Sequence, residues 1–270
     1  MREKNISEDR KKYLRKVKKG KIAVIVTQLL ILLLFIIGWE ILANQGIIDS
    51  FITSQPSRIL NTFLNLSSNG LLEHLGVTLT ETLIGFISGV LLGIAIAICL
   101  WWSPFLSKVS EPYLVVLNSL PKVALGPVII IWVGAGMGAI ITMGLAISLI
   151  VTVLEILNGF LNTDKELIKM AQTFGASKLQ ILTKIVIPAN ITTFFNSLKV
   201  NIGLSLVGVI TGEFLVSKAG LGYLIVYGGQ VFQLDLVMTG VIILAIMAAV
   251  IYEAIILLEK FVMKKMSKKG

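Results

Sequence analysis

The sequence predicts an all-α, polytopic membrane protein with about six transmembrane helices. Composition is the first reason, because 56% of the 270 residues are hydrophobic and only 14% are charged, whereas about a quarter of the residues in a soluble domain are charged. The second reason is that the apolar residues gather in spans near the roughly 20 residues that a helix needs to cross the hydrocarbon core. None of these spans alternates as a membrane β-strand would. We therefore expect helices in lipid.

The spans follow one another with polar connections between them. The first is too long for the apolar region of a signal peptide, so we expect it to be a retained anchor. The third contains Pro121 and Pro127, and prolines inside a helix break it and free backbone carbonyl groups. In chain order the predicted spans are Ile22–Ala43, Val77–Trp101, Tyr113–Val133, Met137–Phe160, Ile191–Val216 and Leu236–Leu258.

The cations indicate the orientation. Of the 24 lysines and arginines, ten precede residue 22, five follow residue 259 and four lie in 165–184, whereas the other side of a six-helix topology holds only Arg58 and Lys218. Positive charge accumulates on the cytoplasmic side of membrane proteins, so we expect both termini there. This gives a basic cytoplasmic tail at 1–21, a transmembrane domain at 22–260 and a second basic tail at 261–270. Anionic lipid accounts for such tails, and we expect no nucleic-acid partner.

Residues for chemistry on a substrate are scarce. The single cysteine, Cys99, lies inside the second span, and the single histidine, His74, lies in the polar loop before it. No sequence motif places a serine or cysteine as a nucleophile. The glycine-rich stretch 134–138 follows an apolar span and carries no charge, which favours a tight turn over a phosphate loop. We therefore expect no catalytic residue, no metal site and no cofactor of the chain's own.

The segment 162–184 is polar but patterned as an amphipathic helix pair. Gly175 and Ser177 interrupt the pattern, as a bend between two short helices would, and Pro188 begins the next span. Such a segment could lie on lipid headgroups or dock a cytoplasmic partner. Its apolar residues recur at spacings of three or four and are Leu167, Met170, Ala171, Phe174, Leu179 and Leu182.

The spacing of Ala171, Gly175, Ile185 and Pro188 resembles the EAA loop of binding-protein-dependent ABC transporter permeases. That loop reads Glu-Ala-Ala, three residues, Gly, nine residues and Ile-x-Leu-Pro. This chain has Lys169 and Met170 in place of the first Glu and Ala, and Ile187 in place of the Leu. The stretches 119–136, 211–225 and 232–244 are similar to the sulfonate, taurine and nitrate-type branch, which also imports thiamine-precursor pyrimidines.

The resemblance implies a MetI-like permease fold in the cytoplasmic membrane and no enzymatic activity of the chain itself. It also implies two ABC ATPase subunits that bind the ATP, an extracytoplasmic solute-binding protein and a second permease copy, for which we expect a homodimer. The cytoplasmic loop would be a coupling helix that docks on the ATPase. Its expected coupling residues are Ala171, Phe174, Gly175, Ile185 and Pro188.

Polar groups inside the spans are the candidates for a solute pathway, because they are costly in lipid. Ser197, Asn201 and Ser205 follow one another on one face of the fifth span, although small residues at this spacing also favour close helix packing. Near the prolines of the third span, Asn118 and Lys122 are further candidates, and Lys122 would attract an anion. An ATPase-independent channel or secondary transporter, and a membrane scaffold or enzyme subunit, remain alternative functions.

Overall fold

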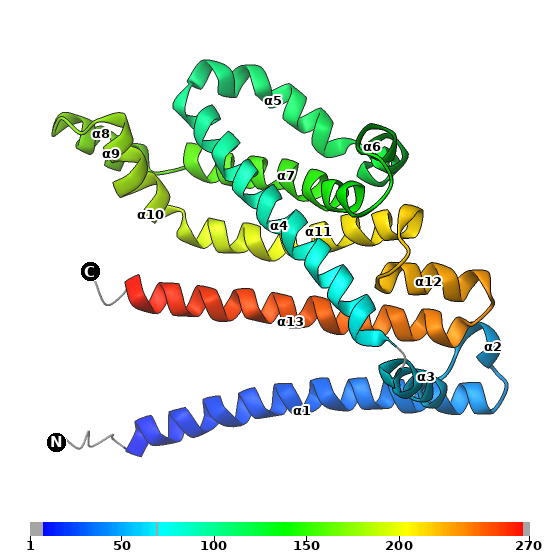
Figure 1. Cartoon of the computed structure of the whole chain (residues 1–270). Coiled ribbons are helices and arrows are strands. Elements are labelled where there is room, and N and C mark those ends of the chain that lie inside the picture. The colour runs from blue at the N-terminus through cyan, green and yellow to red at the C-terminus, as the bar shows by residue number, and fades with distance from the viewer. Residues whose placement is uncertain (1–7, 69, 267–270) are drawn as a thin grey trace.

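The computed structural model describes residues 8–68 and 70–266. Within these residues every regular element is a helix, which confirms the predicted all-α class. The long helices lie across the molecule between two ends (Figure 1). We call the end that carries both termini and the short helices α8–α10 the loop end, and the end that carries α2, α3, α6 and α12 the turn end.

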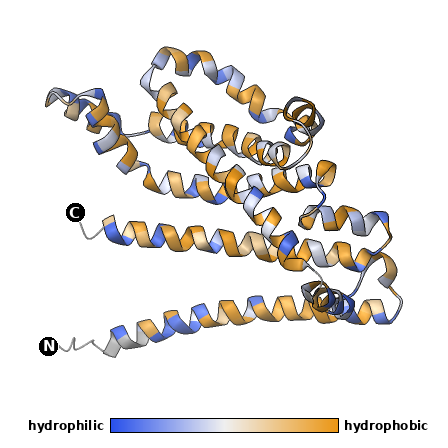
Figure 2. Ribbon diagram, in the orientation of Figure 1, coloured by the Kyte–Doolittle hydropathy of each residue, from blue (hydrophilic) through white to orange (hydrophobic). Residues whose placement is uncertain are grey.

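Five helices are long and apolar enough to cross a membrane. They are α1 (Glu8–Asn44), α4 (Leu71–Trp102), α7 (Met137–Leu161), α11 (Ile191–Val216) and α13 (Leu234–Met266). Hydrophobic residues run along all of them (Figure 2).

The third predicted span is a broken helix. Helix α5 (Pro104–Ser119) is followed by a short 3₁₀ turn, η1 (Lys122–Leu125), and by α6 (Gly126–Val133), and the two parts are bent by 89°. Leu120 stands before Pro121 in extended backbone, the conformation that a following proline favours. Counting this bent pair as one span gives the predicted six.

The core lies where α4, α7 and α11 pack against one another. Small residues let their backbones approach closely, the usual device for helix association in lipid. At Gly208 of α11 an added Cβ would lie 2.7 Å from the Cα of Gly144 in α7. These contacts fix the three central helices and thereby the position of the loops between them.

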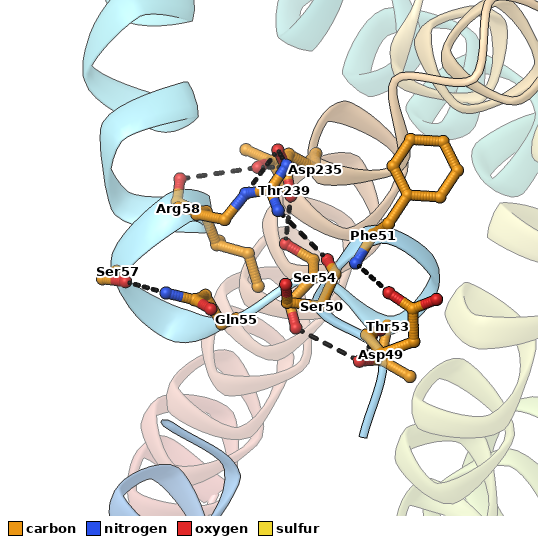
Figure 3. A network of polar contacts seen from close by, with 11 residues as sticks. Asp49, Ser50, Phe51, Thr53, Ser54, Gln55, Ser57, Arg58, Asp235 and Thr239 are labelled. Carbon is orange, nitrogen blue, oxygen red and sulfur yellow. Dashed lines mark hydrogen bonds and ion pairs between the residues drawn. The ribbon is translucent and has the colours of Figure 1, made fainter. Parts of the chain in front are cut away.

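A polar network holds the turn end together (Figure 3). Helix α2 (Ser50–Thr53) and helix α3 (Pro56–Ser68) approach the start of α13. The guanidinium of Arg58 pairs with the carboxylate of Asp235 at 2.6 Å, and the Ser54 hydroxyl donates to the same carboxylate at 2.7 Å. Asp235 stands in the first turn of α13, where the helix dipole favours a negative charge.

Helix α1 touches the rest of the chain chiefly at the turn end, through α3. The described part of the basic amino-terminal tail, 8–21, is helical and runs into the first span without a break. Helix α13 likewise continues into the second basic tail as far as Met266. Residues 1–7 and 267–270 of these tails lie outside the described residues.

Candidate functional site

The loop between α7 and α11 is closed at its base by side-chain hydrogen bonds. The side-chain amide of Asn190, at the start of α11, donates to the Thr163 hydroxyl at 2.8 Å and to the Val186 carbonyl at 2.8 Å. Asn190 and Thr163 are both buried. Gly159 allows this approach, because a Cβ there would lie 2.7 Å from the Asn190 side-chain oxygen. The two ends of the loop are therefore held together at the membrane helices.

The first half of the loop is helix α8 (Lys165–Thr173), and local capping explains where it begins and ends. The Asp164 carboxylate accepts from the Glu166 N–H at 2.8 Å and caps its start. At its end the Ala176 N–H donates to the Ala171 carbonyl and the Gly175 N–H to the Gln172 carbonyl. These two bonds form a Schellman motif, which needs a left-handed residue. Gly175 supplies it with a φ of +77°.

The second half begins immediately with a capping box. Ser177 caps α9 (Lys178–Ile181), and Ser177 and Gln180 each accept a hydrogen bond from the other's backbone N–H. A π-helical turn, η2 (Leu182–Val186), and α10 (Ile187–Ala189) then lead into α11. The predicted coupling residues Ile185 and Pro188 lie in η2 and α10, where Ile185 is half-buried and Pro188 is exposed.

The predicted apolar face of the loop is divided between two directions. Ala171 and Leu182 pack toward the loop-end cluster of buried side chains from α4 and α7, together with Ile168 and Ala176. Four apolar side chains instead remain exposed, and Phe174 is 84% exposed. The apolar side chains therefore do not form the one continuous face that their spacing predicted. Some form an inner face against the buried cluster, and the exposed ones form a second set, which we call the outer ridge. The outer ridge consists of Leu167, Met170, Phe174 and Leu179.

Lys178 is not the free surface charge that its place among the loop lysines suggests. Its ammonium group donates to the carbonyl of Trp102, at the end of α4. The same group lies 5.7 Å from the ring centre of Trp101 and 5.5 Å from that of Trp102. A contact between residues so distant in the chain has no local sequence pattern, so sequence reasoning missed it.

Asn118 and Lys122, predicted as pathway residues, are brought together across the break between α5 and η1. The Lys122 ammonium donates to the Asn118 carbonyl at 3.1 Å and to its side-chain oxygen at 3.2 Å. Carbonyls in the last turn of a helix lack partners within the helix, and Lys122 satisfies one at the end of α5. Lining of a pathway by this pair stays a prediction.

The three predicted pathway residues of α11 are buried within this chain. The side-chain amide of Asn201 donates to the Ser197 carbonyl at 2.9 Å and to its hydroxyl at 3.0 Å. The Ser205 hydroxyl lies 3.4 Å from the Thr82 carbonyl of α4. Contact of this face with α4 and α7 favours the helix-packing interpretation, while a role of Ser197, Asn201 and Ser205 in a pathway stays a prediction.

Lys199, on the same helix, is paired rather than free. Its ammonium lies 2.6 Å from the carboxylate of Glu259 in α13, and both side chains are largely buried. Pairing lowers the cost of placing either charge near lipid. The pair links α11 to α13 on the loop-end side of the bundle.

At the turn end, three side chains cap helix α12 (Leu221–Gln230). The Gly220 N–H donates to His74 Nδ1 at 3.0 Å, the Leu221 N–H to the Thr78 hydroxyl at 2.8 Å and the Gly222 N–H to the Glu213 carboxylate at 2.5 Å. The first backbone N–H groups of a helix need such partners. His74, expected in a loop before the second span, lies instead in the first turn of α4, and its side chain caps α12.

A hollow of about 530 Å³ opens beside these caps. Glu81 of α4 contributes to its wall together with Gly136, Ser217 and Lys218. The Glu81 carboxyl group is buried, and one of its oxygens has no hydrogen-bond partner among the described residues. Glu81 was not among the pathway residues predicted from the sequence.

The described residues hold no group of three or more histidine, cysteine, aspartate or glutamate side chains placed to bind a metal ion. The arrangement of the loop and the central helices instead favours the transmission of movement between them. A capped, two-helix loop with an exposed apolar ridge is attached to three packed membrane helices.

Comparison with known proteins finds a family model over two thirds of the chain. Residues 89–268 match the model described as "binding-protein-dependent transport system inner membrane component". This range contains the loop, α7, α11 and α13.

Individual relatives extend the similarity toward the amino terminus. The chain is 25% identical to the formylaminopyrimidine transport permease protein ThiX of Halalkalibacterium halodurans, over 72% of this chain and 77% of the relative. It is also 25% identical to the putative aliphatic sulfonates transport permease protein SsuC of Bacillus subtilis, over 84% of this chain and 82% of the relative. In fold it is similar to a chain of the MetNI methionine ABC transporter in an inward-facing conformation, with a TM-score of 0.64 and 18% identity, covering 71% of this chain and 95% of the other.

Proposed function

This chain belongs to the family of binding-protein-dependent transport system inner membrane components, and from that membership we propose how its parts work. It is a membrane-embedded permease subunit of an ABC importer for small solutes. We infer that α8–α10 is the coupling segment that docks on an ABC ATPase. ATP binding and hydrolysis occur on that partner, and the loop transmits the movement to the membrane helices.

The exposed outer ridge is the observation that carries this proposal. The loop exposes Phe174, Met170 and Leu179, and these side chains present apolar area that water disfavours. A large aromatic side chain in such a ridge is the usual anchor of a protein interface. Lipid headgroups could also cover the ridge. The family membership favours the ATPase, because its members work with a separate energy-supplying partner.

The remaining partners follow from the same assembly. We place the loop end and both termini in the cytoplasm, where the cations of 1–21 and 260–270 favour them. A binding protein would deliver solute at the turn end. A second copy of this chain would complete the pathway, since one copy offers only a single stripe of polar residues inside its spans.

The solute we propose is either a sulfonate-, taurine- or nitrate-like anion or a thiamine-precursor-type pyrimidine. One of the two relatives is named for a formylaminopyrimidine and the other for aliphatic sulfonates. Uptake of labelled alkanesulfonates, taurine, nitrate and pyrimidines by a deletion strain, with and without the restored gene, distinguishes them. Restoration of uptake for one class identifies it, and uptake that is independent of ATP would contradict the importer assignment.

The docking role is tested by Phe174→Ala. Because the ring is almost fully exposed, its removal leaves the fold intact but takes the anchor from the interface. We expect co-purification of the ATPase to fall at least tenfold, which corresponds to about 1.4 kcal/mol. The matched control is Phe105→Ala, an exposed phenylalanine of α5 outside the loop. Equal ATPase recovery with both variants would refute docking through this ridge.

A further inference from the structure

The first turn of α9 is attached to the end of α4 by one side chain. Lys178 is the first residue of α9, and its ammonium donates to the carbonyl of Trp102, 76 residues earlier in the chain. Trp102 is the last residue of α4, where helix carbonyls have no partner within the helix. A lysine at this place satisfies a carbonyl and also interacts favourably with the helix dipole.

The two tryptophan rings hold the same ammonium group. It lies within 6 Å of both ring centres, the range in which a cation is attracted to an aromatic face. The two rings meet edge to face, with centres 6.3 Å apart. Lys178 therefore has three attractive contacts on α4 and none of them depends on the outer ridge.

The attachment continues into the other central helices. The Trp101 ring packs edge to face on Phe160 of α7 at 6.5 Å, and Phe160 packs against Phe194 of α11 at 5.8 Å. Ile181 and Leu182 of the loop belong to one buried cluster with Phe160 and other side chains of α4 and α7. Contacts from the loop thus reach all three helices that form the core.

We propose that Lys178 is a positioning residue that fixes the coupling segment to the end of α4, so that α4, α7 and α11 follow the loop as one body. The apolar cluster alone would allow α9 to slide or rotate on α4, because apolar contacts have little directional preference. The hydrogen bond to the Trp102 carbonyl sets the direction. This inference rests on the proposed function, since it concerns the transmission of the ATPase movement.

The test measures the distance between the loop and α4 in the purified complex with its ATPase in lipid nanodiscs. One spin label is attached to the native Cys99, exposed in the last turns of α4, and one to Gln172→Cys, exposed on α8. Electron paramagnetic resonance then gives the distribution of distances between the labels, without nucleotide and with ATP and vanadate. In the parent we expect a narrow distribution that is the same in both states, because the two labels move together.

Lys178→Met keeps the aliphatic chain and removes the charge and the donor. We expect its distance distribution to broaden at least twofold and to change with ATP and vanadate. Lys178→Arg, which keeps both properties, should restore the parent distribution. Lys165→Met, at an exposed lysine of the same loop, is the control and should match the parent. Trp102→Leu, which leaves the carbonyl and removes one ring, should broaden the distribution less than Lys178→Met.

The outcomes separate the two proposals. A distribution in Lys178→Met as narrow as that of the parent, in both states, would overturn the positioning role even if the ATPase binds normally. Failure of the parent chain to retain any ATPase would instead count against the proposed function. In that case the distances in the isolated chain still decide whether Lys178 fixes the loop.

Discussion

The carboxylate of Glu213, at the end of α11, accepts a hydrogen bond from the backbone N–H of Gly222 in the first turn of α12. Its other oxygen accepts from the Thr78 hydroxyl of α4 at 2.6 Å. One buried side chain therefore joins three helices at the turn end. Gly222 has to be a glycine for this contact, since an added Cβ would lie 2.7 Å from the Glu213 carboxylate.

Replacement of Gly222 by alanine should therefore destabilise the protein. Excess bulk in a packed site costs about 1–3 kcal/mol, and the neighbouring Glu213 side chain is buried and has little room to move. Thermal unfolding in detergent measures the loss. The control is Gly229→Ala in the same helix, where an added Cβ meets no described atom within 4 Å. That variant should be as stable as the parent or slightly more so, since alanine favours helix over glycine. Equal unfolding temperatures for the two variants would contradict the explanation.

Gly175→Leu should impair the loop through backbone strain. Gly175 has a positive φ and an added Cβ there would meet no described atom within 4 Å, so crowding inside the chain is not the cause. A left-handed residue with a side chain costs about 1–2 kcal/mol, and the new bulk would face the ATPase. We expect reduced ATPase recovery and uptake with normal membrane insertion.

Gly175→Asn provides the comparison, because asparagine tolerates the left-handed conformation better than leucine. It should retain more ATPase than Gly175→Leu. If Gly175→Leu transports normally and holds its ATPase as tightly as the parent, the loop is not the coupling segment.

Asn190→Ala should loosen the base of the loop. The change removes the bonds to Thr163 and Val186, and loss of a buried partner costs about 1–3 kcal/mol. Trypsin should then cleave faster after Lys165 and Lys169. The neighbouring Asn162→Ala, at an exposed side chain, serves as the control. An unchanged cleavage rate for Asn190→Ala would contradict the view that its two hydrogen bonds hold the base of the loop.

Cysteine labelling tests the orientation of the chain. In a Cys99→Ser background, Ala135→Cys stands in the turn between α6 and α7, at the turn end, and Gln172→Cys stands on α8. We expect a membrane-impermeant reagent to label Ala135→Cys in intact cells and Gln172→Cys only after permeabilisation. The reverse pattern would invert the topology that the cations indicate.

Native mass spectrometry of the purified transporter tests its composition. One polar stripe on α11 of a single chain is too little to enclose a solute path. We expect two copies of this chain with two ATPases, related by a two-fold axis. One copy per two ATPases, without another permease, would be incompatible with this assembly.

Local rules in the sequence were sufficient for much of this protein. The length and apolarity of the spans predicted the membrane helices, because the thickness of lipid sets the length of a helix that crosses it. The prolines near Lys122 predicted the break between α5 and α6. Spacing placed Gly175 at the bend of the loop, where glycine meets the local demand for a left-handed residue.

Tertiary structure alone decided how these parts meet. Which apolar loop residues point inward depends on where α4 and α7 end, so Ala171 and Phe174 could not be assigned to opposite faces from their spacing. The partners of Lys178 and Glu213 lie on other helices, and a sequence records neither the distance nor the direction between helices. The chain by itself determines which segments form helices in lipid and where caps and prolines interrupt them, because those rules are local. The first turns of α1, α4 and α5 were not predicted, because they carry polar residues that precede the apolar spans. Only packing in three dimensions selects which polar groups pair, since each must find its partner wherever the other helices place it.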